Sequence, residues 1–200
     1  MTLMVGAAFL PVPTHAAPGR VLAPEDIYSL RSVGSPAVSP DGAWVAYVVT
    51  VNDRASDERR FELRMVSAKG DETVTLAAPS ASLHAPRFSP DGRYISYVAT
   101  PSDSKVSQIL LLDRRGGEPH TLTHVSGDLG EYAWSPNGRE IVAVYEAGDP
   151  DPGTTPLQPQ PRVLRDWHFK QDVTGYLSAG HDRHLVRIRV ADGSLTPLTV

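Results

Sequence analysis

The chain of 200 residues contains no cysteine. A disulfide framework, a zinc site built on thiolates and a cysteine nucleophile are therefore excluded. Basic residues are in the minority, because 19 Lys and Arg stand against 23 Asp and Glu and the formal net charge is −4. Nucleic-acid binding has little electrostatic support in such a chain. The 40% of hydrophobic and 21% of charged residues are typical of a soluble globular protein.

Long apolar runs are also scarce, and no segment approaches the ~20 residues that a membrane helix needs. A short apolar run at 3–10 is followed by two prolines and then by Ala16 and Ala17. This order is typical of a secretory signal peptide at 1–16, although Met1 and Thr2 lack the positive charge usual at its start. We therefore expect an exported protein, either periplasmic or secreted.

Turns, by contrast, are abundant, since the chain holds 18 Pro and 16 Gly. Ser-Pro-Asp-Gly occurs at 39–42 and at 89–92, and it returns as Ser-Pro-Asn-Gly at 135–138. This order suits a type I turn, in which Pro presets the second position and Gly accepts the positive φ that follows. Three copies at near-even spacing indicate an internal repeat.

Each repeated turn is expected to join two strands. Residues that favour strands follow it at 43–49, 93–98 and 139–145. The first of these runs is apolar at consecutive positions, which predicts a strand covered on both faces. Two further strands are expected in each unit, at 61–66 and 73–76, at 108–112 and 120–123, and at 184–190 and 195–199. Four antiparallel strands in about 45 residues predict a β-propeller blade.

The predicted fold is all-β, a partial β-propeller of about three four-stranded antiparallel blades. An N-terminal segment with a short helix (17–32) is expected to precede blades at 33–80, 81–125 and 126–200, the last with an insertion at about 147–183. Propellers close with typically four to eight blades. Three blades therefore favour the N-terminal part of a longer protein. A complete protein of this length would have to self-associate through its open blade edges.

Several segments carry a resemblance to a known family. Ala-Pro-Glu-Asp-Ile-Tyr at 23–28, with the Gly-Ser-Pro-Ala-Val that leads into the first repeated turn, resembles the opening of secreted bacterial peptidases of the prolyl oligopeptidase family. The closest branch is the acylaminoacyl-peptidase and dipeptidyl aminopeptidase type. Residues 117–123 resemble a blade end of that branch. Residues 169–177 resemble part of its third blade, although Val173 stands where Gly is usual.

The resemblance implies a parent serine peptidase in which a propeller restricts access of small peptides to a C-terminal α/β-hydrolase domain. The nucleophile of such a domain needs Gly-x-Ser-x-Gly. No serine of this chain has both glycines; Ser32 and Ser178 have only the second. We therefore assign no catalytic, cofactor-binding or metal-binding residue, expect no cofactor, and predict that this chain alone is inactive. The alternative is a periplasmic interaction propeller that resembles the Tol-system translocation protein and has no enzymatic activity.

Histidines are the residues that most suggest a metal site. His181 and His184 are separated by two residues at the junction of a loop and a strand, and they lack the third ligand that zinc requires. His120 and His124 flank a predicted strand end, where a polar blade edge is the favoured interpretation.

The acidic residues of the turns, Asp41 and Asp91, are expected to stabilise the turns rather than to act as catalytic acids. Asn137 takes their place in the third copy, and an amide cannot replace a carboxylate in proton transfer.

Tryptophan is the remaining candidate for ligand binding. Trp44 and Trp134 adjoin the repeated turn and are expected to pack between blades. Trp167 lies in the insertion and is the one tryptophan that merits a test as a functional surface, although packing is favoured there too.

Overall fold

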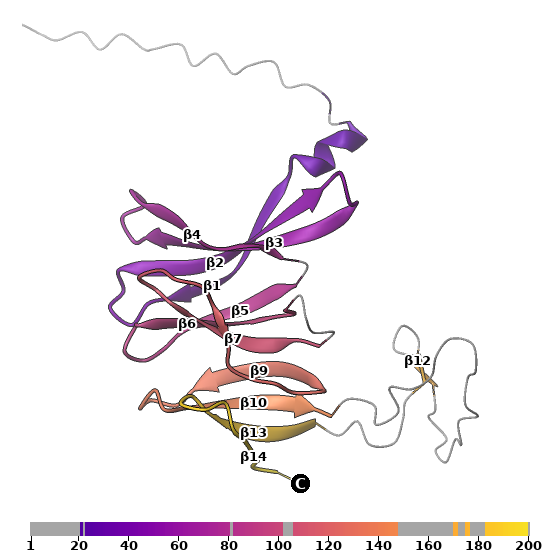
Figure 1. Ribbon diagram of the computed structural model, residues 1–200. Helices are drawn as coiled ribbons and strands as arrows, with labels where there is room; N and C mark the ends of the chain where they lie inside the picture. Colours follow the sequence, from indigo (N-terminus) through magenta and orange to yellow (C-terminus); the bar gives the residue numbers. More distant parts are fainter. Residues whose placement is uncertain are drawn as a thin grey trace, which may run out of the picture.

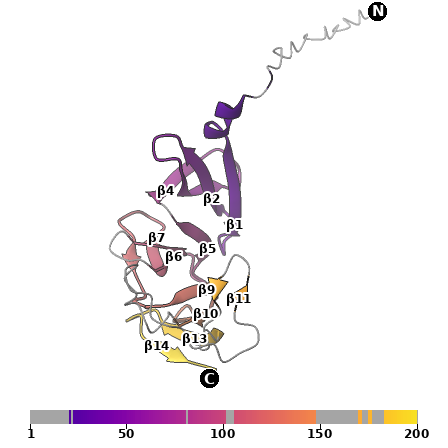
Figure 2. The ribbon, with the colours of Figure 1, turned by 90° about the vertical axis from the view of Figure 1, so that its right-hand side faces the viewer.

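Three four-stranded antiparallel sheets are stacked face to face in chain order, as Figures 1 and 2 show from two sides. The computed structural model describes residues 21, 23–80, 82–101, 106–147, 170–171, 175–176 and 183–199. The predicted all-β partial propeller is confirmed, and each sheet is one blade.

Blade 1 follows a short 3-10 helix, η1 (Pro24–Tyr28), which lies where a short helix was expected. In every blade the spatial order of the strands follows their order in the chain. Blade 1 consists of β1 (Arg31–Val38), β2 (Trp44–Asp53), β3 (Glu58–Ser67) and β4 (Thr73–Ser80). Blade 2 consists of β5 (Leu83–Phe88), β6 (Tyr94–Ala99), β7 (Gln108–Asp113) and β8 (His120–Thr121).

Blade 3 is interrupted by the predicted insertion. Its strands are β9 (Asp128–Trp134), β10 (Glu140–Glu146), β13 (Arg183–Arg189) and β14 (Leu195–Pro197). Between β10 and β13 the chain forms a small two-stranded sheet of β11 (Lys170–Gln171) and β12 (Gly175–Tyr176). The described helices include none that is long and apolar enough to cross a membrane.

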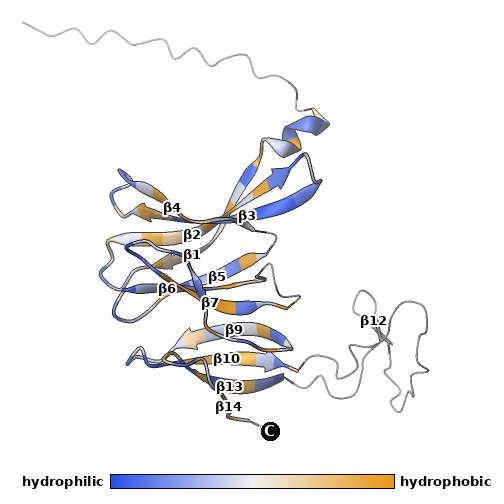
Figure 3. Cartoon of the chain, in the orientation of Figure 1, coloured by the Kyte–Doolittle hydropathy of each residue, from blue (hydrophilic) through white to orange (hydrophobic). Residues whose placement is uncertain are grey.

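Burial on both faces is found in the middle blade rather than in the first. All residues of β6 after Tyr94, and all of β7 before Asp113, are buried, because blades 1 and 3 cover the two faces of blade 2. The run at 43–49 in blade 1 was expected to be covered on both faces. This prediction is only partly right, because Val45 and Tyr47 are half-buried. Among the described residues, a sheet packs on one face of blade 1 only. Figure 3 shows apolar residues concentrated along the stacked strands.

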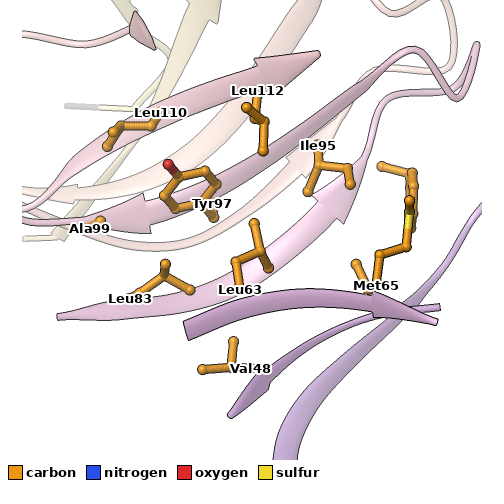
Figure 4. Close-up of a cluster of buried hydrophobic side chains, with 11 residues drawn as sticks. Val48, Leu63, Met65, Leu83, Ile95, Tyr97, Ala99, Leu110 and Leu112 are labelled. Carbon is orange, nitrogen blue, oxygen red and sulfur yellow. The ribbon is translucent and has the colours of Figure 1, made fainter. Parts of the chain in front are cut away.

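Two apolar clusters hold the stack together, one at each blade interface. Figure 4 shows the first, in which Leu63 and Met65 of β3 meet Ile95 and Tyr97 of β6. The second joins Ile109 and Leu111 of β7 to blade 3. Fully burying one such aliphatic side chain contributes about 1.5–3 kcal/mol. The blades are thus held mainly by side-chain packing, since hydrogen-bonded strand pairing occurs within each blade.

Candidate functional site

The three repeated turns lie one above another at the same edge of the stack. A Cβ atom built on Gly92 would lie 3.6 Å from Cδ of Pro40. A Cβ atom on Gly138 would lie at the same distance from Cδ of Pro90. Each proline therefore covers the glycine of the next turn, and the motif joins neighbouring blades as well as neighbouring strands.

Hydrogen bonds within each turn involve the serine and the acidic or amide side chain. Ser39 Oγ donates to Asp41 Oδ1 (2.5 Å) and accepts from the N–H of Trp44 (2.9 Å), while the N–H of Ala43 donates to Asp41 Oδ1 (3.0 Å). Ser89 and Asp91 repeat this arrangement. The φ angles of the three glycines are 68°, 69° and 68°, which confirms the predicted geometry.

The third turn shows that a negative charge is not needed for this geometry. The amide oxygen of Asn137 accepts from Ser135 Oγ (2.7 Å) and from the N–H of Arg139 (2.9 Å), as the carboxylates do in the other copies. Hydrogen bonds from Ser39 and Ala43 hold the pKa of Asp41 at about 2, and those from Ser89 and Arg93 lower the pKa of Asp91. These carboxylates stabilise their turns, whereas a general acid or base needs a pKa near the working pH.

Acid sensitivity follows from these pKa values. A carboxyl whose pKa is lower in the folded than in the unfolded chain stabilises the fold above about pH 4, and that stabilisation is lost as the pH falls towards 2. We expect the Asp41→Asn variant to take up about one proton fewer than the wild-type chain, at most, when it unfolds in acid. Asn137→Asp should do the reverse. Denaturant titrations between pH 2 and pH 6 would measure both, and equal pH dependence in both variants would contradict the assignment.

Tryptophan packing between blades is confirmed for the two described residues. Trp44 packs against the cluster between blades 1 and 2, and Trp134 packs against the cluster between blades 2 and 3. Trp167, His181 and the predicted signal peptide at 1–16 lie outside the described residues.

Trp134 also belongs to a buried polar network between blades 2 and 3. Its indole N–H donates to Ser96 Oγ (2.8 Å), which lies 2.9 Å from the Tyr132 hydroxyl, and that hydroxyl donates to the carbonyl of Ala85 (2.7 Å). Burial raises the pKa of Tyr132 well above its ordinary value. The sequence carries no signal for this network, because each of its hydrogen bonds joins residues that are 36 to 47 positions apart.

The structure brings two of the histidines together. His124 follows blade 2 and His184 lies in β13, and both line one groove of about 570 Å³ together with Tyr145. Val186 and Leu195 form much of its apolar lining. Among the described residues, no three His, Asp or Glu side chains gather in a way that would hold a metal ion. His120, the other histidine of the β8 end, does not line this groove.

Comparison with known proteins gives one curated relative and several similar structures. No family model matches the chain. It is 25% identical over 185 residues to the uncharacterised peptidase YuxL of Bacillus subtilis. The match covers 90% of this chain but 28% of that peptidase, so the chain spans little more than a quarter of the relative's length.

Two solved peptidase structures share the fold. Acylaminoacyl peptidase of Pyrococcus horikoshii matches with a TM-score of 0.64 and 15% identity, over 86% of this chain and 26% of that one. The β-propeller domain of the trilobed protease of Pyrococcus furiosus matches with a TM-score of 0.55 and 14% identity, over 82% of this chain and 41% of that one. The chain resembles the propeller part of a peptidase family.

Propellers outside the peptidases are similar as well. A candidate TolB from Agrobacterium tumefaciens matches with a TM-score of 0.53 and 18% identity, over 82% of this chain and 47% of that one. At these identities the structural matches establish the propeller fold, whereas the peptidase likeness also rests on the curated relative.

Proposed function

We propose that this chain is the propeller part of an exported serine peptidase that cleaves small peptides. In this role the blades limit the size of the substrates that reach a hydrolase domain, which we place outside the 200 residues. The observation that carries the proposal is the similarity to a peptidase along 90% of the chain. The segments at 23–42 and 117–123, which resemble the prolyl oligopeptidase family, support it, and the signal-like sequence at 1–16 supports export.

The stacked blades suit a passive filter. Apolar clusters pack blade 2 against both of its neighbours, so the three sheets should behave as one rigid unit. The repeated turns contribute no proton-transfer group, because Asp41 and Asp91 are held in turn hydrogen bonds. Chemistry would therefore have to come from another part of the parent protein.

Gene sequencing and peptidase assays, made on this chain and on the parent protein, test this proposal. Sequencing the gene beyond the codon for Val200 should reveal further blades and a Gly-x-Ser-x-Gly motif. The parent protein, recovered from the periplasm or culture fluid, should hydrolyse short peptide p-nitroanilides and lose that activity to a serine-directed inhibitor. The 200-residue chain should show no turnover above background.

Two results would refute it. Turnover by the 200-residue chain that a serine-directed inhibitor abolishes would place a nucleophile within it. Further blades without the serine motif would instead favour the interaction propeller, for which the similarity to the candidate TolB is the supporting observation.

A further inference from the structure

The first strand of each blade forms one edge of its sheet. β1, β5 and β9 all occupy that position. Close backbone approach between neighbouring blades is concentrated at β5 and β9. Since the blades of a propeller converge towards a central channel, these first strands lie beside that channel.

Two positions of the first strand differ between blade 2 and the other two blades. They are the fifth and the second residue before the serine of the repeated turn. In blade 2 they hold His84 and Arg87, and both side chains reach solvent. In blades 1 and 3 the same positions hold small residues, namely Gly34, Ala37, Gly130 and Ala133. Of the three blades, only blade 2 therefore carries hydrogen-bond donors on side chains at these positions.

A bulge in β5 brings these two side chains onto one face of the sheet. Residues three apart in a regular strand point to opposite faces. The register of β5 shifts between His84 and Arg87, so they pair with Val98 and Ser96, which are two apart in β6. Paired residues share a face, and Val98 and Ser96 face blade 3. Neighbours on one face of a strand are about 7 Å apart, so both side chains can contact one ligand group.

The buried polar network between blades 2 and 3 holds the bulge on both sides. The Tyr132 hydroxyl donates to the carbonyl of Ala85 (2.7 Å), and Ser96 Oγ donates to the carbonyl of Arg87 (3.2 Å). Ala85 is also the residue of the bulge with a positive φ, at 51°. These bonds fix the backbone before a ligand arrives, and such pre-organisation lowers the entropic cost of binding.

Arg87 brings a positive charge to this edge of blade 2. Burial raises the pKa of Tyr132, whereas its hydrogen bond with Ser96 and the nearby charge of Arg87 oppose the rise. Within the part of the chain that the structure describes, no carboxylate forms an ion pair with Arg87, and this includes the exposed Asp128 and Glu131 of β9. The guanidinium therefore keeps the planar fork of N–H donors that matches a carboxylate.

We propose that His84 and Arg87 bind the carboxylate of a peptide beside the central channel. Arg87 would make a bidentate contact with the two carboxylate oxygens. Desolvation lowers the pKa of His84, so its imidazole is neutral near pH 7 and adds one N–H donor. The choice of a peptide as the ligand rests on the proposed function, whereas the preference for a carboxylate rests on the two side chains.

Calorimetric titration of the 200-residue chain with N-acetyl-trialanine and with its C-terminal amide tests the site. The acid should bind at least about tenfold more tightly than the amide, because hydrogen bonds between charged groups are the strong ones. Arg87→Ala, which installs the residue found in blades 1 and 3, should abolish that difference. Arg87→Lys keeps the charge but loses the fork, so it should restore only part of the affinity. His84→Ala should weaken binding less than Arg87→Ala does.

Arg139→Ala is the matched control, because Arg139 is also exposed but follows the repeated turn of blade 3, at the other end of its strand pair. It should leave the affinity unchanged, and circular dichroism would verify that all variants keep their sheet content. An acetylated tripeptide amide with a central aspartate separates a side-chain carboxylate from a C-terminal one. Binding of either carboxylate that depends on Arg87 would support the site.

Three results would overturn the proposal. They are failure of both carboxylate peptides to bind, equal affinity for the acid and the amide, and an equal loss of affinity in Arg139→Ala and Arg87→Ala. The titration measures binding and not turnover. A negative result would therefore leave the proposed peptidase role intact, and an inactive parent protein would leave the carboxylate site intact.

Discussion

Replacing Gly193 with alanine is expected to destabilise the fold by about 3 kcal/mol. Gly193 lies in the turn between β13 and β14 with a φ of 68°, which costs an L-residue about 1 kcal/mol. A Cβ atom there would also overlap the backbone carbonyl oxygen of Leu122 in blade 2. A backbone group cannot move aside by changing rotamer, so the two blades would have to separate locally, at a cost of about 1–3 kcal/mol.

Gly42 supplies a matched control for this prediction. Its φ is also 68°, but a Cβ atom there would meet nothing within 4 Å. Gly42→Ala should therefore cost only the conformational term of about 1 kcal/mol. Urea unfolding followed by tryptophan fluorescence would measure both variants. Equal destabilisation by the two would mean that the contact between the blade 3 turn and Leu122 does not persist in solution.

Ser96→Ala is expected to cost about 2 kcal/mol despite removing a single oxygen atom. Ser96 is fully buried, and its hydroxyl accepts from the Trp134 indole and contacts the Tyr132 hydroxyl. Without it, the indole N–H of the half-buried Trp134 loses its acceptor and the buried Tyr132 hydroxyl loses a partner, and an unsatisfied buried polar group costs about 1–3 kcal/mol.

A double-mutant cycle with Trp134→Phe would isolate this interaction. Once the indole N–H is gone, Ser96→Ala should become clearly less harmful, so the two changes should not be additive. Ser194→Ala is the matched surface control, because its hydroxyl donates to Asp192 in an exposed turn. That change should stay within about 0.5 kcal/mol. Additive effects of Ser96→Ala and Trp134→Phe would show that the network is not coupled.

The parts of the fold that the sequence predicts are those determined locally. The repeated turn is closed by hydrogen bonds among residues no more than five positions apart, so its motif alone specifies it. The last strand of blade 2 is shorter than the expected 120–123. Beyond Thr121, the N–H of Leu122 makes one more backbone hydrogen bond, to the carbonyl of Ile109. A side chain then takes the place of the backbone, because Thr123 Oγ1 accepts from the N–H of Ile109 and donates to Gln108.

Apart from the packing of Trp44 and Trp134, the contacts between blades are not predicted by the sequence, because they join residues that are distant in the chain. The meeting of His124 and His184 in one groove depends on how blade 3 lies against the end of blade 2. The strand irregularities were also missed. Ser35 and Ala85 adopt positive φ angles of 50° and 51°, and both precede a proline within the first strand of a blade. Residue type gives no warning there, since neither is glycine.

The contact of each turn proline with the next turn glycine has a consequence for how such a chain can diverge. Pro40 and Gly92 belong to different copies of the repeat, yet a methyl group on Gly92 would already contact the ring of Pro40, and the same holds for Gly138 and Pro90. A side chain larger than a methyl group at Gly92 would have to be accommodated by the blade before it. The substitutions that the turn glycine of one repeat can accept are therefore limited by the turn proline of the repeat before it. Tandem copies joined in this way would keep the turn motif long after the strands between the turns had lost their sequence similarity.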